Sequence, residues 1–296
     1  EKRWCYTGII HPEIIFGCAV VHLGYISSAF AFGFDRQEKR MVEHSLVFPP
    51  LGQVRFDRNP ENGICSYKSF RGRLILTHDH KHEQKSMDVS FYLPGKSLRA
   101  KIEIIEPDGG ISPMHFLIPM TEKTSAFTTK IAGLKARGEI LINKKKMNLA
   151  PENCFAVFDW TNGFYPRKTS WNWACGAGFA SEGSQIGFNF SSGVYEHGVL
   201  ENTVWVNGRP LKQGPVLFTY NSSKPEHPWL IKSEDGRIDI KFTPEGIRKS
   251  NDNLGFIKSQ FIQPCGSFEG SIQTHDNLHL HLSSVGGVVE EHYAKW

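Results

Sequence analysis

The sequence of 296 residues lacks the short motifs that mark common nucleotide-binding and hydrolytic sites. It has no Gly-x-x-x-x-Gly-Lys phosphate loop, no Gly-x-Gly-x-x-Gly fingerprint after a strand and no Gly-x-Ser-x-Gly nucleophile elbow. Its six cysteines include no Cys-x-x-Cys pair, and their spacing matches no zinc pattern. We therefore predict neither an organic cofactor nor a metal. The even cysteine count permits three disulfides, but the absent framework favours a reduced, cytoplasmic protein.

The sequence also lacks an excess of one charge. Lys and Arg number 34 and Asp and Glu number 30, which gives a formal net charge of +4. No strongly basic face is implied, so nucleic acid is not predicted as a partner. No signal peptide is visible, although the chain starts at Glu1 without a methionine, so a leader is possible.

One segment, residues 14–34, carries no Asp, Glu, Lys or Arg and is long enough on count alone to span a bilayer. Its Phe, Val and Ile residues are mixed with Gly and Ser, which fits strands better than a membrane helix. We interpret it as two buried strands with a turn near residues 23–25. No transmembrane segment is predicted.

A helical apolar period is missing as well, whereas strand-like runs dominate. Clear examples are residues 73–77, 89–93, 99–105, 154–160, 186–190, 203–206, 238–242 and 278–282. Turn signals such as Asn162-Gly163 and Asn207-Gly208 separate them. Glycine (28), proline (16) and aromatic residues (21 Phe, 8 Tyr, 7 Trp) are abundant. This composition predicts an all-β sandwich or barrel.

A faint internal repeat divides the chain. The pattern of residues 56–76, from Phe-x-x-Asn to Gly-Arg-Leu-x-Leu, recurs at residues 218–240. Trp4-Cys5 likewise has a counterpart in Trp173-Ala174-Cys175. We therefore predict two similar β domains, residues 1–148 and 149–296, joined near residues 144–151. The second domain carries most of the distinctive strings.

Those strings carry a resemblance to a known family. They are Asp159–Arg167 (DWTNGFYPR), Thr169–Gly176 (TSWNWACG), Ile186–Gly193 (IGFNFSSG), Glu201–Gly208 (ENTVWVNG), Ser233–Arg237 (SEDGR) and Glu290–Trp296 (EEHYAKW). Together with Trp4–Gly8 and His22–Tyr25, they resemble the domain of unknown function 2804 family over essentially the whole chain. The family's name implies no activity.

The duplicated strand layout is also similar to the double-lipocalin proteins, which include carotenoid hydratases, fungal cyclases and lipid-handling proteins. This resemblance implies two lipocalin-like (calycin) antiparallel β-barrel or sandwich halves packed together. A ligand would then lie in a barrel mouth or between the halves. Fold-level similarity does not fix the function.

The first candidate site residue is Asp159. Strand alternation places it on one face with Phe155 and Val157, and a carboxylate there costs free energy unless it is paired. Arg167, across the Asn162-Gly163 turn, is the expected partner. The pair is either an oriented acid or base at a pocket mouth or a clamp that closes a hairpin.

Three tryptophans are candidate ligand contacts. Trp171 and Trp173 share a strand face, which is suited to stacking on a ligand ring or to filling the core. Trp205 shares a face with Glu201. If Trp205 faces a lumen, Glu201 is desolvated, its pKa rises and it becomes a general acid.

The opposite face of the Trp205 strand carries Val204 and Val206, which look like core residues and would bury Asn202 with them. A buried asparagine needs partners for both ends of its amide. Asn189, on the preceding predicted strand, is a candidate donor to a ligand oxygen. Asn202 and Asn189 therefore join the candidate ligand-binding set.

The C-terminal residues Glu291, His292 and Tyr293 form either part of a site or a latch of the chain end. His292 titrates near neutrality and suits proton transfer, whereas Tyr293 would contact a ligand.

Elsewhere, His78, His80 and His82 alternate as divalent-metal ligands would, but the carboxylate Glu83 falls on the opposite face. A solvated strand or loop is the preferred interpretation there.

These observations predict a cofactor-independent acid/base enzyme of the hydratase, isomerase, cyclase or lyase type. Asp159, Glu201 and His292 would move protons, and a largely apolar or alicyclic small molecule would be the ligand. A carrier of a lipid without turnover and a glycan-acting enzyme remain alternatives, as does a structural module without a cavity. If the three ionisable residues converge on one cavity, catalysis is favoured over carriage. The oligomeric state is left open.

Overall fold

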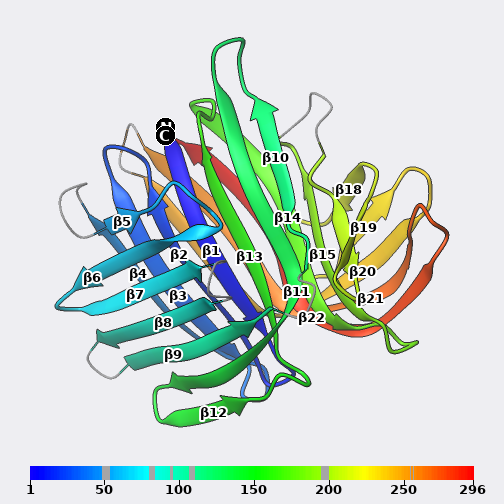
Figure 1. Ribbon diagram of the computed structural model, residues 1–296, viewed down its shortest axis with the longest axis horizontal. Coiled ribbons are helices and arrows are strands. Elements are labelled where there is room, and N and C mark those ends of the chain that lie inside the picture. The colour runs from blue at the N-terminus through cyan, green and yellow to red at the C-terminus, as the bar shows by residue number, and fades with distance from the viewer. Residues whose placement is uncertain are drawn as a thin grey trace.

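The computed structural model describes residues 1–48, 54–79, 84–93, 96–106, 111–194, 200–253, 255 and 257–296. These residues form strands, turns and bends, and none of them is helical. The predicted all-β class is therefore confirmed. The strands make two curled antiparallel sheets that pack together (Figure 1).

The first sheet contains thirteen strands among the described residues, in the order β4-β3-β2-β1-β13-β11-β9-β8-β7-β6-β5, with β10 and β12 paired to β11. Their bounds are β1 Lys2–Ile10, β2 Ile14–His22, β3 Ser27–Asp35, β4 Arg40–Phe48, β5 Val54–Phe56, β6 Asn62–Ser69, β7 Gly72–Asp79, β8 Gln84–Leu93, β9 Lys96–Ile105, β10 Met114–Pro119, β11 Ser125–Ile142, β12 Lys145–Leu149 and β13 Phe155–Gly163.

The second sheet contains nine described strands in the order β17-β16-β15-β14-β22-β21-β20-β19-β18. Their bounds are β14 Lys168–Phe179, β15 Gln185–Ser192, β16 Thr203–Val206, β17 Arg209–Lys212, β18 Val216–Thr219, β19 Trp229–Ser233, β20 Ile238–Asn253, β21 Lys258–Gln273 and β22 His279–Lys295. All predicted strand runs fall within or across these elements.

The two sheets follow the same path. Strands β1 to β4 correspond to β14 to β17, and β5 to β9 correspond to β18 to β22. The predicted counterparts lie on corresponding strands. Trp4 lies on β1 and Trp173 on β14, while Gly72 begins β7 and Gly236 precedes β20. In the first sheet β11 and β13 separate β1 from β9, whereas β14 pairs directly with β22.

The predicted domain division at residues 148 and 149 stays a prediction. The change from one sheet to the other falls between Gly163 and Lys168. Strand β13, which follows the predicted boundary, pairs with β1 and β11 of the first sheet.

The uncharged segment forms β2 and β3, which pair with each other as expected, with bends near residues 24–25. Both strands are largely buried against the first core. Among the described residues, the protein contains no helix long and apolar enough to cross a membrane.

The buried apolar residues form two clusters. The larger cluster fills the first sheet and extends into the second through Trp173, Trp205 and Cys265. The smaller cluster lies in the second sheet and includes Val204 and Val206. Strand β16 is therefore buried on both faces: Val204 and Val206 are core residues as predicted, and Trp205 belongs to the other core cluster rather than to a lumen.

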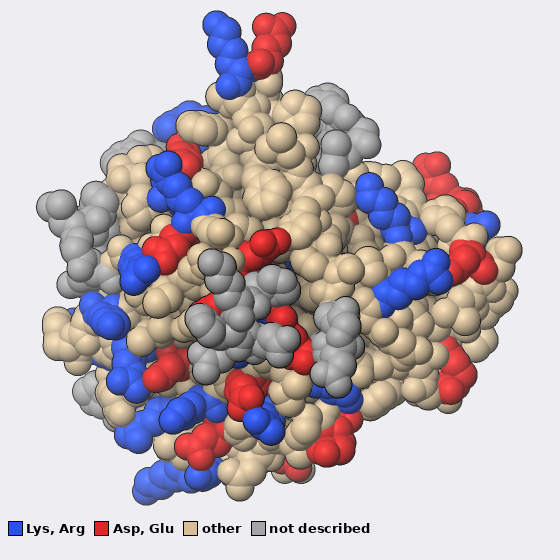
Figure 2. Space-filling model, in the orientation of Figure 1, with Lys and Arg blue, Asp and Glu red and all other residues tan. Residues whose placement is uncertain are grey.

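All six cysteines are buried and unpaired, so none forms a disulfide. On the face shown in Figure 2, basic and acidic side chains are interspersed rather than gathered by sign. The surface seen there gives no support to a polyanionic partner.

Candidate functional site

A cavity of about 260 Å³ lies between the two sheets. Strands β1 to β4, β11 and β13 contribute one wall, and β14 and β20 to β22 contribute the other. Aromatic side chains dominate the lining: Trp4, Tyr6, Phe30, Tyr165, Trp171, Trp173, Phe261 and Trp296. A mostly apolar cavity with a few convergent polar groups is typical of a small-molecule site.

Strand register builds the wall contributed by the second sheet. His292 on β22 lies directly opposite Trp171 on β14 and Phe261 on β21. Two residues along, Glu290 lies opposite Trp173. Because side chains alternate between the faces of a strand, this pairing turns all five residues toward the cavity.

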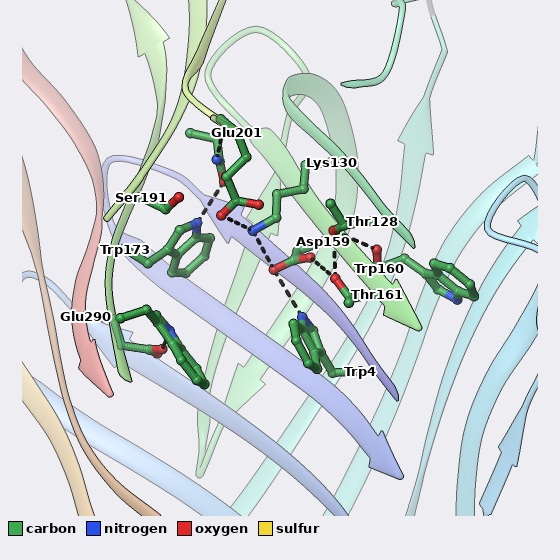
Figure 3. Close-up of polar contacts among 12 residues, drawn as sticks. Trp4, Thr128, Lys130, Asp159, Trp160, Thr161, Trp173, Ser191, Glu201 and Glu290 are labelled. Atoms are coloured by element: carbon green, nitrogen blue, oxygen red, sulfur yellow. Dashed lines mark hydrogen bonds and ion pairs between the residues drawn. The ribbon is translucent and has the colours of Figure 1, made fainter. Parts of the chain in front are cut away.

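Three charged side chains, Lys130, Asp159 and Glu201, meet at the cavity. Lys130 on β11 is paired with Asp159 on β13, and its Nζ lies 3.1 Å from Asp159 Oδ2. The same Nζ lies 3.1 Å from Oε1 of Glu201, which precedes β16. Figure 3 shows the ammonium group between the two carboxylates. The group is nearly excluded from solvent, with relative side-chain exposures of 6% for Lys130 and 4% for Glu201.

Asp159 has a partner for each carboxylate oxygen. Trp4 Nε1 donates to Oδ2 at 3.3 Å, in addition to Lys130. Thr161 Oγ1 donates to Oδ1 at 3.3 Å. The predicted ion pair with Arg167 is wrong, because among the described residues the cation beside Asp159 is Lys130. Lys130 lies directly across the strand pair, whereas Arg167 follows the end of β13.

Glu201 is less completely paired. Its Oε2 is buried and has no hydrogen-bond partner among the described residues. Burial raises the pKa of Glu201 above its ordinary value, the charge of Asp159 raises it further, and Lys130 and the Ser191 hydroxyl only partly offset these effects. Burial alone would lower the pKa of Lys130, but Asp159 and Glu201 hold it above its ordinary value.

The opposite wall carries a second polar group. Glu290 accepts hydrogen bonds from Trp171 Nε1 at 2.9 Å and from Gln263 Nε2 at 2.6 Å. Its Oε1 lies 3.4 Å from Nδ1 of His292. Although burial opposes ionisation, His292 and Trp171 lower the pKa of Glu290 below its ordinary value. His292 Nε2 lies 3.0 Å from Ser259 Oγ.

A buried cation lies along the same wall. Arg248 Nε donates to Glu43 at 2.6 Å, and Nη1 donates to Gln263 at 3.3 Å. Its guanidinium lies over the rings of Phe30 and Phe261 at 4.0 and 4.4 Å from their centroids. These contacts fix the guanidinium in position at the cavity.

The structure brings five of the predicted site residues together. Asp159, Glu201, His292, Trp171 and Trp173 all line the cavity. The other five predicted residues, Arg167, Asn189, Asn202, Trp205 and Tyr293, are not among its lining residues.

The two asparagines have structural partners. Asn189 accepts from Trp173 Nε1 at 2.7 Å and donates to the Glu201 carbonyl at 2.8 Å. Asn202 accepts from the Ser191 amide and donates to the carbonyl of Gly214. Both ends of each amide are thus occupied, and Asn189 positions a cavity tryptophan and the backbone of Glu201.

The remaining three predicted residues also have partners in the structure. Arg167 Nη1 donates to the carbonyl of Trp296 at 3.2 Å. Trp205 Nε1 donates to the carbonyl of Ser112 at 2.9 Å. Tyr293 lies one residue from His292 and so on the other face of β22, where Lys258 Nζ is 5.8 Å from its ring centroid.

Sequence reasoning missed Lys130, Arg248, Ser259 and Glu290. Lys130 has a visible signal, because it stands alone among the uncharged residues of a strand-like run, Ala126–Leu134. Glu290 and His292 alternate on one strand, which also identifies a shared face. Ser259 carries no such signal, because His292, which it contacts, lies on a strand more than thirty residues away.

The predicted alternation of His78, His80 and His82 reaches beyond the described residues, since His80 and His82 lie outside them. His78 is buried and its ring lies on Phe158, with centroids 4.4 Å apart. Burial lowers the pKa of His78 to about 3. The described residues include no cluster of histidine, cysteine and acidic side chains arranged to hold a metal ion.

Comparisons with solved structures give the same fold. The structure of CghA superposes with a TM-score of 0.55 at 10% identity, covering 98% of this chain and 87% of that chain. A putative AttH (NE1406) from Nitrosomonas europaea gives 0.52 at 12%, covering 98% and 91%. Kievitone hydratase from Nectria haematococca gives 0.50 at 14%, covering 99% and 88%. At these identities the likeness shows the fold alone.

A search of curated protein sequences gave no match. The family model described as "Domain of unknown function (DUF2804)" matches residues 1–296. Its span agrees with the strings that run from Trp4 to Trp296. The chain therefore belongs to the DUF2804 family, with a fold of two lipocalin-like β halves packed together.

Proposed function

We propose that the protein is a cofactor-independent acid/base enzyme that acts on a small, largely apolar molecule in the cavity between its sheets. The observation that carries the proposal is the convergence of Asp159, Glu201 and His292 on one aromatic cavity. Glu201, which also lines the cavity, adds a buried carboxyl oxygen that has no hydrogen-bond partner among the described residues. Such a group is costly to bury and is typical of functional sites.

Glu201 is the proposed general acid. Its raised pKa keeps a larger fraction protonated near neutral pH than an exposed glutamate would have. It donates a proton from Oε2 to a ligand oxygen or double bond, and Lys130 stabilises the carboxylate that remains. Asp159, held by Trp4 and Lys130, is the proposed base. These steps suffice for hydration, elimination, isomerisation or cyclisation.

The aromatic walls support an apolar ligand. Trp4 donates to Asp159, and the Trp173 ring lies beside the Lys130 ammonium, so two tryptophans adjoin the acid and base groups. An apolar or alicyclic ring stacks on such surfaces, while its polar end meets the carboxylates. The name of kievitone hydratase is consistent with a hydration reaction on this fold.

The test begins with native mass spectrometry of the protein purified from its own cells, which identifies any bound small molecule. The identified molecule is then incubated with wild type, with Glu201→Gln and with Glu291→Gln. Glu291 belongs to β22 but is not among the cavity residues, so it is the matched control. We expect conversion by wild type and the control, and a loss of about 10²–10⁴-fold in Glu201→Gln. A copurified molecule that wild type never alters contradicts catalysis.

A carrier of a hydrophobic ligand is the second candidate function. The observation that favours it is the pairing of both Asp159 oxygens, which leaves that carboxylate structurally satisfied. A ligand bound without turnover, with unchanged affinity in Glu201→Gln, supports carriage.

A further inference from the structure

Ser259, His292 and Glu290 lie in series along one cavity wall. The hydroxyl of Ser259 lies 3.0 Å from His292 Nε2, and His292 Nδ1 lies 3.4 Å from Glu290 Oε1. All three residues line the cavity. A nucleophile, a base within hydrogen-bond reach and a third group that orients the base are the components of nucleophilic catalysis.

The imidazole is fixed by its neighbours on both flanking strands. Trp171 on β14 and Phe261 on β21 both lie opposite His292, with ring centroids 4.2 and 5.7 Å away. Ser259 lies two residues before Phe261, so it shares the cavity face of β21 and meets the imidazole diagonally. Rigid strands thus hold the nucleophile and base together.

Glu290 sets the tautomer of the imidazole. Trp171 and Gln263 donate to its two oxygens, so the carboxylate is held in place and remains an acceptor toward His292. An ionised carboxylate beside Nδ1 keeps the proton on that nitrogen, which leaves Nε2 free to accept from Ser259.

We infer that this group is a second reactive centre, in which Ser259 attacks small hydrophobic carboxylic esters that enter the aromatic cavity. Ser259 is the nucleophile, His292 the base and Glu290 the positioning residue. The inference goes beyond the proposed acid/base reaction, which uses Glu201 and Asp159.

The reaction requires only the ester and water. Ser259 Oγ forms a bond to the ester carbonyl carbon while its proton passes to His292 Nε2. The bond from that carbon to the alkoxy oxygen breaks, and the proton on Nε2 leaves with the alcohol. Water then attacks the acyl carbon, gives a proton to Nε2, and releases the acid while Ser259 regains its proton.

The cavity also contains positive charge for the oxyanion that forms in each step. The guanidinium of Arg248 lines it, over the ring of Phe261. A cation near a tetrahedral intermediate stabilises its oxygen. Asp252, opposite Ser259, already accepts a hydrogen bond from Ser250 at 2.6 Å.

The test uses a short-chain alkyl fluorophosphonate, which phosphonylates an activated serine and releases fluoride. The full-length protein is incubated with the probe, and intact mass followed by peptide mapping locates the adduct. We expect one adduct, on Ser259, and none in Ser259→Ala. The rate of adduct formation in His292→Gln should fall by about 10²–10⁴-fold, because the base is lost.

Ser271→Ala is the matched control. Ser271 lies on the same strand as Ser259 and is likewise half-buried, but it is not among the cavity residues. This variant should react at the wild-type rate. Glu290→Gln tests positioning: it should slow labelling and move the pH midpoint of the labelling rate, which a merely structural role would not do. Circular dichroism confirms that each variant is folded.

Hydrolysis of p-nitrophenyl butyrate gives a second readout. Wild type should release nitrophenolate with the same dependence on Ser259 and His292 as the labelling. An adduct on another residue, an adduct retained in Ser259→Ala, or a folded wild type that neither reacts with the probe nor hydrolyses the ester would overturn the inference. None of these outcomes bears on the proton transfer proposed for Glu201.

Discussion

At the scale of single residues, Lys130 is the cation that pairs with the carboxylates of both Asp159 and Glu201. Lys130 and Glu201 are buried and Asp159 is half-buried. Removing one partner of a buried ion pair leaves an uncompensated charge. We expect Lys130→Met to lower the free energy of unfolding by about 3–5 kcal/mol, measured by urea denaturation. The surface pair Lys146–Glu139 supplies the control, since Lys146→Met should cost less than about 1 kcal/mol.

His78 makes stability depend on pH. Its folded pKa of about 3 lies below the ordinary value of 6.5 because its ring is buried, and its Nδ1 has no partner among the described residues. Between these values the unfolded chain binds a proton that the folded chain does not. Stability is therefore fully present above pH 6.5 and falls by about 1.4 kcal/mol per pH unit below it.

Urea midpoints between pH 7 and pH 5 check this expectation. His78→Leu should lose that part of the pH dependence, whereas His227→Leu, at an exposed position, should keep it. An equal slope in His78→Leu and wild type would contradict the assignment.

At the scale of elements, the two sheets meet most closely where β11 crosses β15. A Cβ at Gly187 would lie 2.3 Å from the carbonyl carbon of Ala132, a backbone atom that cannot rotate away. The contact falls at the bulge of β11, where Gly133 has a positive φ of 90° and its carbonyl accepts from Gln185.

Gly187→Ala should therefore lower the free energy of unfolding by about 1–3 kcal/mol, because the strands must move apart. Gly214→Ala is the control, since its new Cβ would meet only an atom of Asp235 at 4.0 Å. Thermal unfolding followed by circular dichroism measures both. Equal destabilisation by the two variants would mean that the crossing tolerates a side chain.

Local sequence predicts the strands but not their partners. The alternation that placed Trp171 with Trp173 depends only on the period of a strand, and the structure turns both toward one cavity. The neighbour of Asp159 depends on which strand pairs with β13, and β11 begins thirty residues earlier. Arg167 is the cation nearest to Asp159 in the sequence, whereas Lys130 lies directly opposite Asp159 on the paired strand.

At the scale of the whole molecule, the internal repeat predicted two similar halves, and the matching strand paths agree with it. The repeat did not predict a cavity walled by both sheets, because sequence similarity between halves contains no information on how they pack. The site therefore depends on tertiary contacts such as Arg248 of β20 with Glu43 of β4, which are 2.6 Å apart.

The same contacts predict how the protein unfolds. One core cluster extends through both sheets by way of Trp173, Trp205 and Cys265, and Arg36 and Glu245 form an ion pair across them at 2.5 Å. Unfolding either sheet alone would expose the part of this cluster that the other covers. We expect one cooperative transition in urea, with hydrogen exchange of β3 and β20 rising at the same midpoint. Two separate midpoints would show that each sheet is stable without the other, and that the cavity between them can open without global unfolding.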